Sequence, residues 1–420
     1  MDAASRPRLR SVETVVARDP EHGKVLVLRD TRGVAPGHAV LPPPLVPLVA
    51  RFTGSLRCDE IAREVSIEVG TDIPVDVVVR LAVELERALF LEGPAFRAAL
   101  AGAERQFAES PIRAAAHAGG AYYAEGVPLA KYVEDCRVRA TKQAQPASRL
   151  PLPNGDGRMV ALVSPHIDPW RGALCYGHAY SALAAALPPQ ADTFVVFGTS
   201  HAPMREPFSL CRKAFDTPLG LVEADLAAID ELAKKTQGFD PYADQFNHKV
   251  EHSLEFQVVF LKNVMAGRPF RIVPILAGLG AHQSTGLDPA EEPSVATFIG
   301  AVRDLVHSRD GRVVVVSGAD MAHVGPRFGD AKPYDPPARE ALERKDRESL
   351  DHAIALDASG FWSQVAADLD DRRVCGLAPT WSLLSVISAI RPRGRVLHYE
   401  QTVDAGDGSI VSHAAVGYYA

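Results

Sequence analysis

The sequence is poor in cysteine, and its cysteines do not form pairs. All five are widely spaced along the 420 residues, with no C-x-x-C pair among Cys58, Cys136, Cys175, Cys211 and Cys375. This spacing argues against a zinc ribbon and against the disulfide framework of small secreted proteins. We therefore expect a protein of a reducing compartment.

Long apolar runs and an excess of positive charge are also missing. No stretch approaches the about 18 uninterrupted apolar residues of a transmembrane helix, and no apolar signal-peptide core follows the first residues. The net charge of −7 provides no general attraction to nucleic acid or to an anionic membrane. P-loop, dinucleotide-binding and kinase motifs are absent too. We expect a cytoplasmic protein that binds neither nucleic acid nor membrane.

What the sequence does contain is an ordinary globular composition over a length that suits two domains. Hydrophobic residues make up 47% and charged residues 23%, a balance that excludes an extended disordered chain. A chain of 420 residues is long enough for two substantial cores. The residue pattern changes near position 105, which predicts one domain over 1–105 and a second over 106–420.

The first 105 residues predict a small α+β domain. Short strands are expected at 25–30 and 39–41, and helices at 45–52, 59–65 and 75–91. This order resembles the small winged-helix modules of the PqqD type, which bind peptides through a strand edge and an adjacent helix. An appendage used for packing or dimerisation is an equal alternative. DNA binding is disfavoured, because the last helix carries more acidic than basic residues.

From residue 159 onward, strand-like and helix-like segments alternate. The helical stretches are expected at 177–187, 223–235, 252–265, 294–308, 338–355 and 380–390, and residues 143–158 are expected to be a surface connection. Such alternation is typical of βαβ units around a parallel or mixed sheet. In such a sheet the carboxyl ends of the parallel strands meet at one crevice.

Three apolar runs end in residues that can bind a metal. The first ends at His166, the second at His201, and the third at Asp320 and His323. A single histidine of this kind is usually structural, but two at matching strand ends are the arrangement that a shared site needs. Imidazole suits Zn, Cu, Fe or Ni, and an added carboxylate with open positions suits non-haem iron. The pattern predicts one polar, metal-capable pocket.

A further polar cluster covers residues 247–257. If a helix begins here, Glu251 and Glu255 share one face, as do His248 and His252. We expect His252 together with Glu251 to act as an acid/base group beside the metal. The H-E-x-x-H spacing of zinc metalloproteases is not present. The nearby run 198–202 approaches a G-x-S-x-G nucleophile elbow but ends in alanine before a proline, which disfavours a serine hydrolase.

From about residue 114 to the carboxyl terminus, the chain resembles the Memo family, whose microbial members are called AmmeMemoRadiSam system protein B. The matching phrases stand in family order at 116–119, 122–123, 164–166, 176–180, 198–201, 251–255, 272–276, 320–325 and 375–376. The family fold is an α/β sandwich with a central mixed sheet, similar to class III extradiol dioxygenases, which are non-haem iron enzymes. The resemblance implies a dioxygenase-like pocket for a small-molecule ligand, with Fe(II) first and Cu or Zn as alternatives.

The resemblance also implies a set of metal ligands. His166 and His201 match the two histidine ligands of the Memo site, and His252 matches a further pocket histidine. The third ligand position, a cysteine in the animal protein, falls on Ala322 in this matching. Because alanine cannot bind metal, we expect Asp320 or His323 to complete the shell, or water to fill the position, or metal binding to be weak.

Two functions remain open at this point. One is a metal-binding protein with redox or oxygenase chemistry on a small or peptide-linked substrate. The other is a non-catalytic binding or scaffold protein of a radical-SAM-associated modification system. In that case the amino-terminal module would bind a peptide, or a radical-S-adenosylmethionine or AMMECR1-like partner protein.

Overall fold

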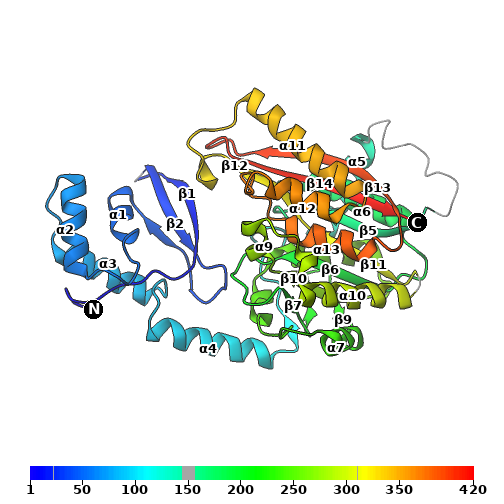
Figure 1. Ribbon diagram of the computed structural model, residues 1–420, viewed down its shortest axis with the longest axis horizontal. Helices are drawn as coiled ribbons and strands as arrows, with labels where there is room; N and C mark the ends of the chain where they lie inside the picture. The colour runs from blue at the N-terminus through cyan, green and yellow to red at the C-terminus, as the bar shows by residue number, and fades with distance from the viewer. Residues whose placement is uncertain (22, 144–156, 310) are drawn as a thin grey trace. The chain divides into compact units, whose positions relative to one another are not determined.

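The chain divides into two compact units, Met1–Ser110 and Pro111–Ala420. The structure is a computed structural model that describes residues 1–21, 23–143, 157–309 and 311–420 (Figure 1). The surface connection predicted over 143–158 therefore lies for the most part outside the described residues. The division falls at residue 110 rather than at 105, because helix α4 (Pro94–Glu109) continues to that point. No described helix is both long enough and apolar enough to cross a membrane.

The first unit is a three-stranded antiparallel sheet with helices. Its strands run in the order β1 (Glu13–Asp19), β2 (Gly23–Arg29) and β3 (Ala39–Leu41). A short 3-10 turn and the helices α1 (Val46–Val49), α2 (Cys58–Val69) and α3 (Val75–Arg87) come next, before α4. Their apolar faces form one core, with buried Leu28, Leu41, Phe52, Ile61 and Leu85. Strand β1 was not predicted from the sequence, because none of its residues is buried and its sequence, ETVVARD, does not alternate between apolar and polar residues.

The second unit is built on a large mixed sheet, as the sequence predicted. Its main path runs β12 (Asp320–Val324), β14 (Ile410–Tyr419), β5 (Met159–Ser164), β11 (Val313–Gly318), β6 (Thr193–Thr199), β10 (Arg271–Ala277) and β7 (Phe208–Leu210). Strands β5, β11, β6 and β10 are parallel neighbours. Strands β14 and β7 flank them antiparallel, and β13 (Arg393–Val403) pairs with β14. The four parallel strands therefore end on the same edge.

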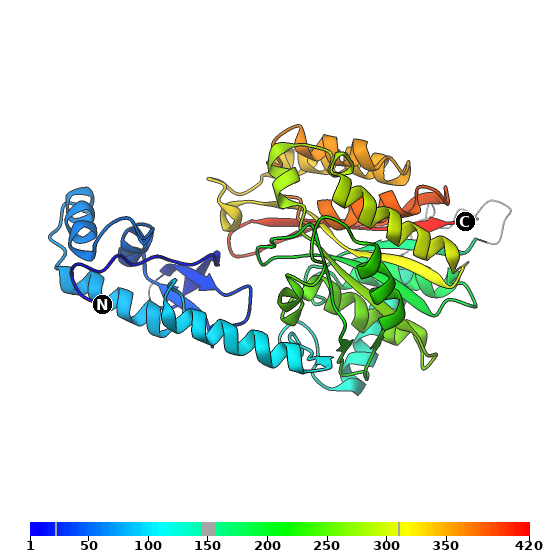
Figure 2. The same cartoon turned by 60° about the horizontal axis from the view of Figure 1, so that its bottom comes forward.

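Helices cover both faces of this sheet (Figures 1 and 2). One face carries α6 (Ala173–Ala186) and α8 (His252–Met265), with α5 (Gly126–Gln143) packed on α6. The other face carries α13 (Leu377–Ile387) and α7 (Leu226–Lys235), with α10 (Pro293–Ser308) and α12 (Ala358–Ala366) packed on them. Helix α11 (Pro336–Ile354) packs on α12 and β13, and the short α9 (Gly280–Thr285) lies against α12 and α13. This is the layered arrangement expected when strands and helices alternate.

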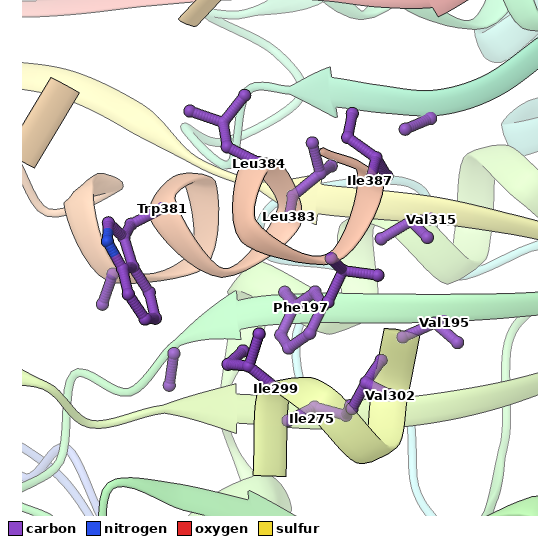
Figure 3. Close-up of a cluster of buried hydrophobic side chains, with 14 of the residues drawn as sticks. Val195, Phe197, Ile275, Ile299, Val302, Val315, Trp381, Leu383, Leu384 and Ile387 are labelled. Atoms are coloured by element: carbon purple, nitrogen blue, oxygen red, sulfur yellow. The ribbon is translucent and has the colours of Figure 1, made fainter. Parts of the chain in front are cut away.

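The core lies between the parallel strands and the α10–α13 layer (Figure 3). Strand residues such as Phe197 and Val315 are fully buried against Trp381 and Leu384 of α13 and Val302 of α10. Strands buried on both faces read as continuous apolar runs, which explains why the sequence showed them clearly. The rigid strands give the residues at their ends a fixed position.

Candidate metal centre

Three neighbouring parallel strands bring the predicted polar residues together. Strands β5, β11 and β6 are adjacent in that order. Two residues after their ends stand His166, Asp320 and His201, respectively. The imidazole rings of His166 and His201 have their centroids 5.2 Å apart. Two residues separated by 35 positions in sequence therefore face each other at the crevice outside the strand ends.

His166 is held with one ring nitrogen directed to the site. Its Nδ1 lies 2.9 Å from the carbonyl oxygen of Gly318, which can only accept, so the neutral ring carries its proton on Nδ1. Burial lowers the pKa of His166 and favours that neutral form, although the nearby Asp320 carboxylate opposes the shift. The lone pair of Nε2 is thereby left to the site, 3.0 Å from the Sγ atom of Cys375.

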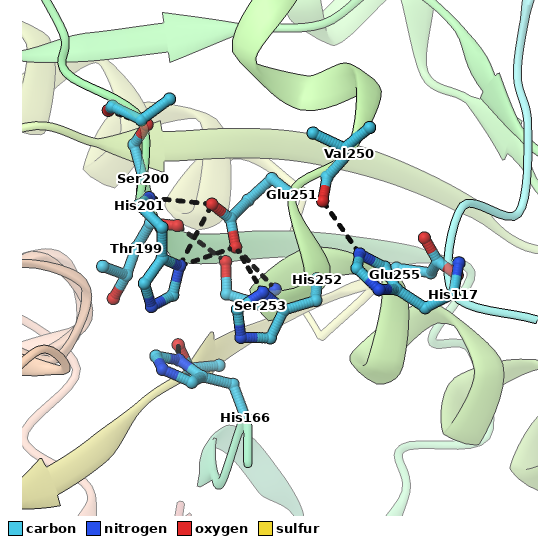
Figure 4. Close-up of polar contacts among 12 residues, drawn as sticks. His117, His166, Thr199, Ser200, His201, Val250, Glu251, His252, Ser253 and Glu255 are labelled. Carbon is cyan, nitrogen blue, oxygen red and sulfur yellow. Dashed lines mark hydrogen bonds and ion pairs between the residues drawn. The ribbon is translucent and has the colours of Figure 1, made fainter. Parts of the chain in front are cut away.

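His201 is oriented by a buried carboxylate. Its Nδ1 lies 3.0 Å from Oε1 of Glu251, and its backbone N–H donates to Oε2 of the same residue at 2.8 Å (Figure 4). Burial on its own would raise the pKa of Glu251, but the charge and hydrogen bonds of His201 hold that pKa well below its ordinary value. A carboxylate on Nδ1 leaves the lone pair of His201 on Nε2, an arrangement that is usual for histidines in metal sites.

Glu251 can do this because it is the N-cap of helix α8. Its side chain accepts a hydrogen bond from the backbone N–H of Ser253 at 2.9 Å, and the hydroxyl of Ser253 donates to the Thr199 carbonyl at 2.8 Å. The first turn of α8 also lies directly against the end of β11. A Cβ atom on Gly318 would overlap with the Ser253 carbonyl, so this approach requires glycine.

Cys375 completes a group of three donor atoms. One ligand atom from each of His166, His201 and Cys375 lies within 4.8 Å of the other two. The turn before α13 is held there because the Thr199 hydroxyl donates to the Cys375 carbonyl at 2.7 Å. Gly376 allows the close approach, since a Cβ atom there would overlap with the Asp320 carbonyl. Burial, and next the charge of Asp320, raise the pKa of the Cys375 thiol well above its ordinary value.

The ring of His252 packs against both of these histidines. Its ring stacks on that of His201 at 4.5 Å and meets that of His166 edge-on at 5.4 Å. Its Nδ1 lies 3.4 Å from Oε1 of Glu251, and one ligand atom each from His201, Glu251 and His252 form a second converging group. Burial and the neighbouring His201 lower the pKa of His252 well below its ordinary value, so the ring is neutral.

The two residues expected to supply the third ligand lie differently. Asp320 accepts a hydrogen bond from the His166 backbone N–H at 2.8 Å, and its Oδ2 lies 3.7 Å from His166 Nε2, so it borders the group without belonging to it. His323 points its Nδ1 at the Met321 carbonyl, 3.3 Å away, and packs edge-on against Phe328. Burial lowers the pKa of His323 to about 4.

Ala322, the position that the resemblance matched to the third ligand, lies outside the converging donor atoms. Ala322 is fully buried in a separate apolar cluster with Val324, Leu342 and Ile410, and its backbone N–H donates to Ser412. The third donor atom beside His166 and His201 is the sulfur of Cys375. The sequence does hold a signal for Cys375, because Cys375-Gly376 is one of the phrases shared with the family, but that phrase alone does not indicate a ligand.

Two more features were not assigned from the sequence. The ring of His117 meets that of His252 edge-on at 5.6 Å, and its Nε2 lies 2.8 Å from the Val250 carbonyl. A cavity of about 580 Å³ opens beside the centre and is lined by His201 and Cys375 at one end and by His282 and Glu292 elsewhere. Its size suits a small molecule.

Comparison with known proteins places most of the chain in one family. A family model described as Memo-like protein matches residues 113–418. A MEMO1 family protein from Aquifex aeolicus is 26% identical over 95% of this chain and 97% of its own length, and so extends into the first unit. A MEMO1 family protein from Methanosarcina acetivorans is 32% identical over 59% of this chain and 84% of its own. A crystal structure of an uncharacterized protein from Escherichia coli K12 covers 62% of this chain and 99% of its own at 14% identity, with a TM-score of only 0.32.

Proposed function

The chain belongs to the Memo-like protein family, and we propose that its second unit binds a metal ion through His166, His201 and Cys375. The observation that carries this proposal is the orientation of the donors. Both histidines have Nδ1 engaged by a carbonyl or a carboxylate, and one ligand atom of each converges with the cysteine sulfur within 4.8 Å. Such outer contacts are typical of histidines that bind metal.

The donor set also bears on the identity of the metal. Two imidazoles and a thiolate suit Fe, Cu or Zn, and the soft sulfur excludes Mg²⁺ and Ca²⁺ as natural occupants. We propose Fe(II) as the physiological ion, as in the extradiol-dioxygenase-like reading, with Cu and Zn as competitors. Asp320 would be a neighbouring carboxylate that anchors the His166 backbone, and the neutral His323 ring, held at the Met321 carbonyl, would not be a ligand.

The proposed chemistry is redox or oxygenase-type conversion of a small or peptide-linked substrate by a protein of the AmmeMemoRadiSam system protein B type. A bound metal would supply Lewis acidity and an electron conduit. The chain's own residues would do the rest. The cavity beside His201 and Cys375 would hold the substrate, and the neutral His252 ring, which stacks on His201 and is backed by Glu251, would accept a proton.

Metal analysis of the anaerobically purified full chain tests this function. We expect close to one equivalent of iron in the wild-type protein and none in the His166→Ala or His201→Ala variants. A protein that stays metal-free after incubation with Fe(II), Cu(II) and Zn(II) would contradict the proposal. With iron bound, O₂ consumption in the presence of catecholic or other chelating compounds would then test for turnover.

A second candidate function concerns the first unit. Among the described residues, strand β1 pairs only with β2, so its other edge offers backbone N–H and C=O groups to an extended peptide. A PqqD-like module that presents a peptide, or binds a radical-S-adenosylmethionine partner, would use such an edge. Replacing Val16, at the middle of β1, by proline should abolish capture of such a peptide, and unchanged capture would refute this role.

A further inference from the structure

A fully buried ion pair lies behind the metal centre. Arg113, in the short strand β4 (Ile112–Arg113), pairs with Glu255 of α8, and the side chains are 0% and 1% exposed. Taking two charges out of water is costly, and a hydrophobic pair of the same volume would often be at least as stable. The hydrogen bonds that this pair makes to neighbouring segments therefore bear on its role.

The Arg113 guanidinium holds the backbone of Glu251, which orients His201, and of the residues just before it. Its Nε donates to the His248 carbonyl at 2.9 Å, and its Nη2 donates to the Glu251 carbonyl at 2.9 Å. The segment between these two carbonyls leads directly into the N-cap of α8. A planar guanidinium has donors in a fixed fork, so it sets the position of both carbonyls at once.

The Glu255 carboxylate organises a second segment on the other side of the pocket. It accepts hydrogen bonds from the backbone N–H groups of Ala116 at 3.1 Å and His117 at 2.9 Å, and from the hydroxyl of Tyr122. Those bonds fix the loop that carries the His117 ring against His252, and Figure 4 shows Glu255 beside His117. One ion pair thus supports both the segment that orients His201 and the loop that carries His117.

We propose that Arg113 and Glu255 are positioning residues of the metal centre. Their ion pair holds the backbone of Glu251 where its carboxylate can keep the proton of His201 on Nδ1, so that Nε2 stays available as a ligand. This inference rests on the proposed function, because the positioning role requires that His201 binds a metal. The tautomer of His201 is nevertheless a property of the metal-free chain and can be measured without any metal.

The experiment compares Arg113→Lys and Glu255→Gln with wild type in the full chain. Tyr122→Phe is a milder third variant, which removes one hydrogen bond to Glu255 and leaves the ion pair in place. Asp346→Asn is the matched control, because Asp346 and Arg372 form an equally buried pair with a 2.7 Å Nη1–Oδ1 distance that contacts none of the three proposed ligands. Tautomers are read from ¹⁵N spectra of histidine-labelled protein, with the His201 signals assigned by their loss in His201→Ala.

We expect wild type and Asp346→Asn to show His201 protonated on Nδ1. Arg113→Lys and Glu255→Gln should show a mixture of both tautomers, and Tyr122→Phe a smaller admixture. Metal affinity should fall by about tenfold or more in the first two variants and stay unchanged in Asp346→Asn, although that control also loses stability.

Two outcomes would overturn the inference. One is an unchanged His201 tautomer in all three variants, and the other is an equal loss of metal affinity in Asp346→Asn. The failure of the proposed function has a different signature, since the wild-type protein would then bind no metal while the tautomer comparison still gave its answer. A variant that does not fold is replaced by Tyr122→Phe, whose smaller shift has the same sign.

Discussion

Two histidine clusters lie on the sheet of the second unit, and their side chains are arranged in opposite ways. The strand-end cluster consists of His166, His201, His252 and Cys375. The strand-pair cluster consists of His178 on α6, His398 and Glu400 on β13, and His413 on β14. Each has three imidazoles, so the number of histidines does not distinguish them.

The difference lies in where the ring nitrogens are held. In the strand-pair cluster, His178 and His398 stack face to face at 4.5 Å with an 11° angle between the rings, and His413 Nε2 lies 3.0 Å from the Thr402 hydroxyl. Among the described residues, the converging groups of ligand atoms are formed by the strand-end cluster together with Glu251. The convergence of ligand atoms therefore depends on outer contacts that turn the nitrogens to one point, and not on the number of histidines.

The most direct test of the difference between the two clusters is to remove one imidazole from each. His201→Ala should reduce metal binding at least a hundredfold, since two remaining donors hold a divalent ion far less firmly. His398→Ala should leave it unchanged. Isothermal titration with Zn(II) measures both, and comparable losses in the two variants would show that the clusters are not distinct.

The outer carboxylates provide the next test. Glu251→Gln removes the negative charge from His201 Nδ1, and metal affinity should fall about 10–100-fold. Glu400→Gln makes the same change beside His398, whose Nε2 lies 3.5 Å from Oε2, and should have no effect on metal affinity. If Glu251→Gln binds metal as tightly as wild type, the orienting role of this carboxylate is refuted.

The pH dependence of metal binding tests the thiol. Because burial raises the pKa of Cys375 well above its ordinary value, the group is protonated at neutral pH and must lose that proton to bind. The pKa of His166 is lowered, so its ring is already neutral there. Affinity should therefore rise about tenfold per pH unit from about pH 7 upward, and Cys375→Ala should lose this slope. An identical slope in both proteins would exclude the thiol as a ligand.

The smallest expected effect belongs to the strand-pair cluster. Burial and the charge of His398 lower the pKa of His178 to about 4. Between about pH 4 and 6.5 the unfolded chain therefore binds more protons, and the free energy of unfolding rises with pH. The slope should be only a fraction of about 1.4 kcal/mol per pH unit, because the ring is partly exposed. Urea unfolding of His178→Phe should show a flatter pH dependence, with metal binding unaltered; a slope equal to that of wild type would contradict the assignment.

The sequence predicted the parts of this molecule that follow from local pattern. The apolar runs of β5 and β6 stop sharply before His166 and His201, and parallel strands bring such ends together. Helix α4 was missed although Gly93 and Pro94 mark its start, where proline is well tolerated. Strand β1 was missed because its residues, which include no buried one, show no alternation of apolar and polar types.

Cys375 could not be predicted in the same way. It lies more than 170 residues beyond His201, precedes a helix and follows no strand, so no periodicity marks it. Its position depends on close packing at Gly376 and on a hydrogen bond from Thr199, which are tertiary contacts. The sequence favoured Asp320 or His323 as the third ligand instead, because the Asp-x-x-His spacing of β12 is visible in it.

The most direct test of the central claim is a Co(II) titration of the metal-free full chain beside Cys375→Ser. Wild type should bind one equivalent and develop the intense near-ultraviolet absorption of a cobalt–thiolate bond, which should be missing in Cys375→Ser. Cobalt binding without that absorption in wild type, or the same absorption in Cys375→Ser, would contradict a centre made of His166, His201 and Cys375.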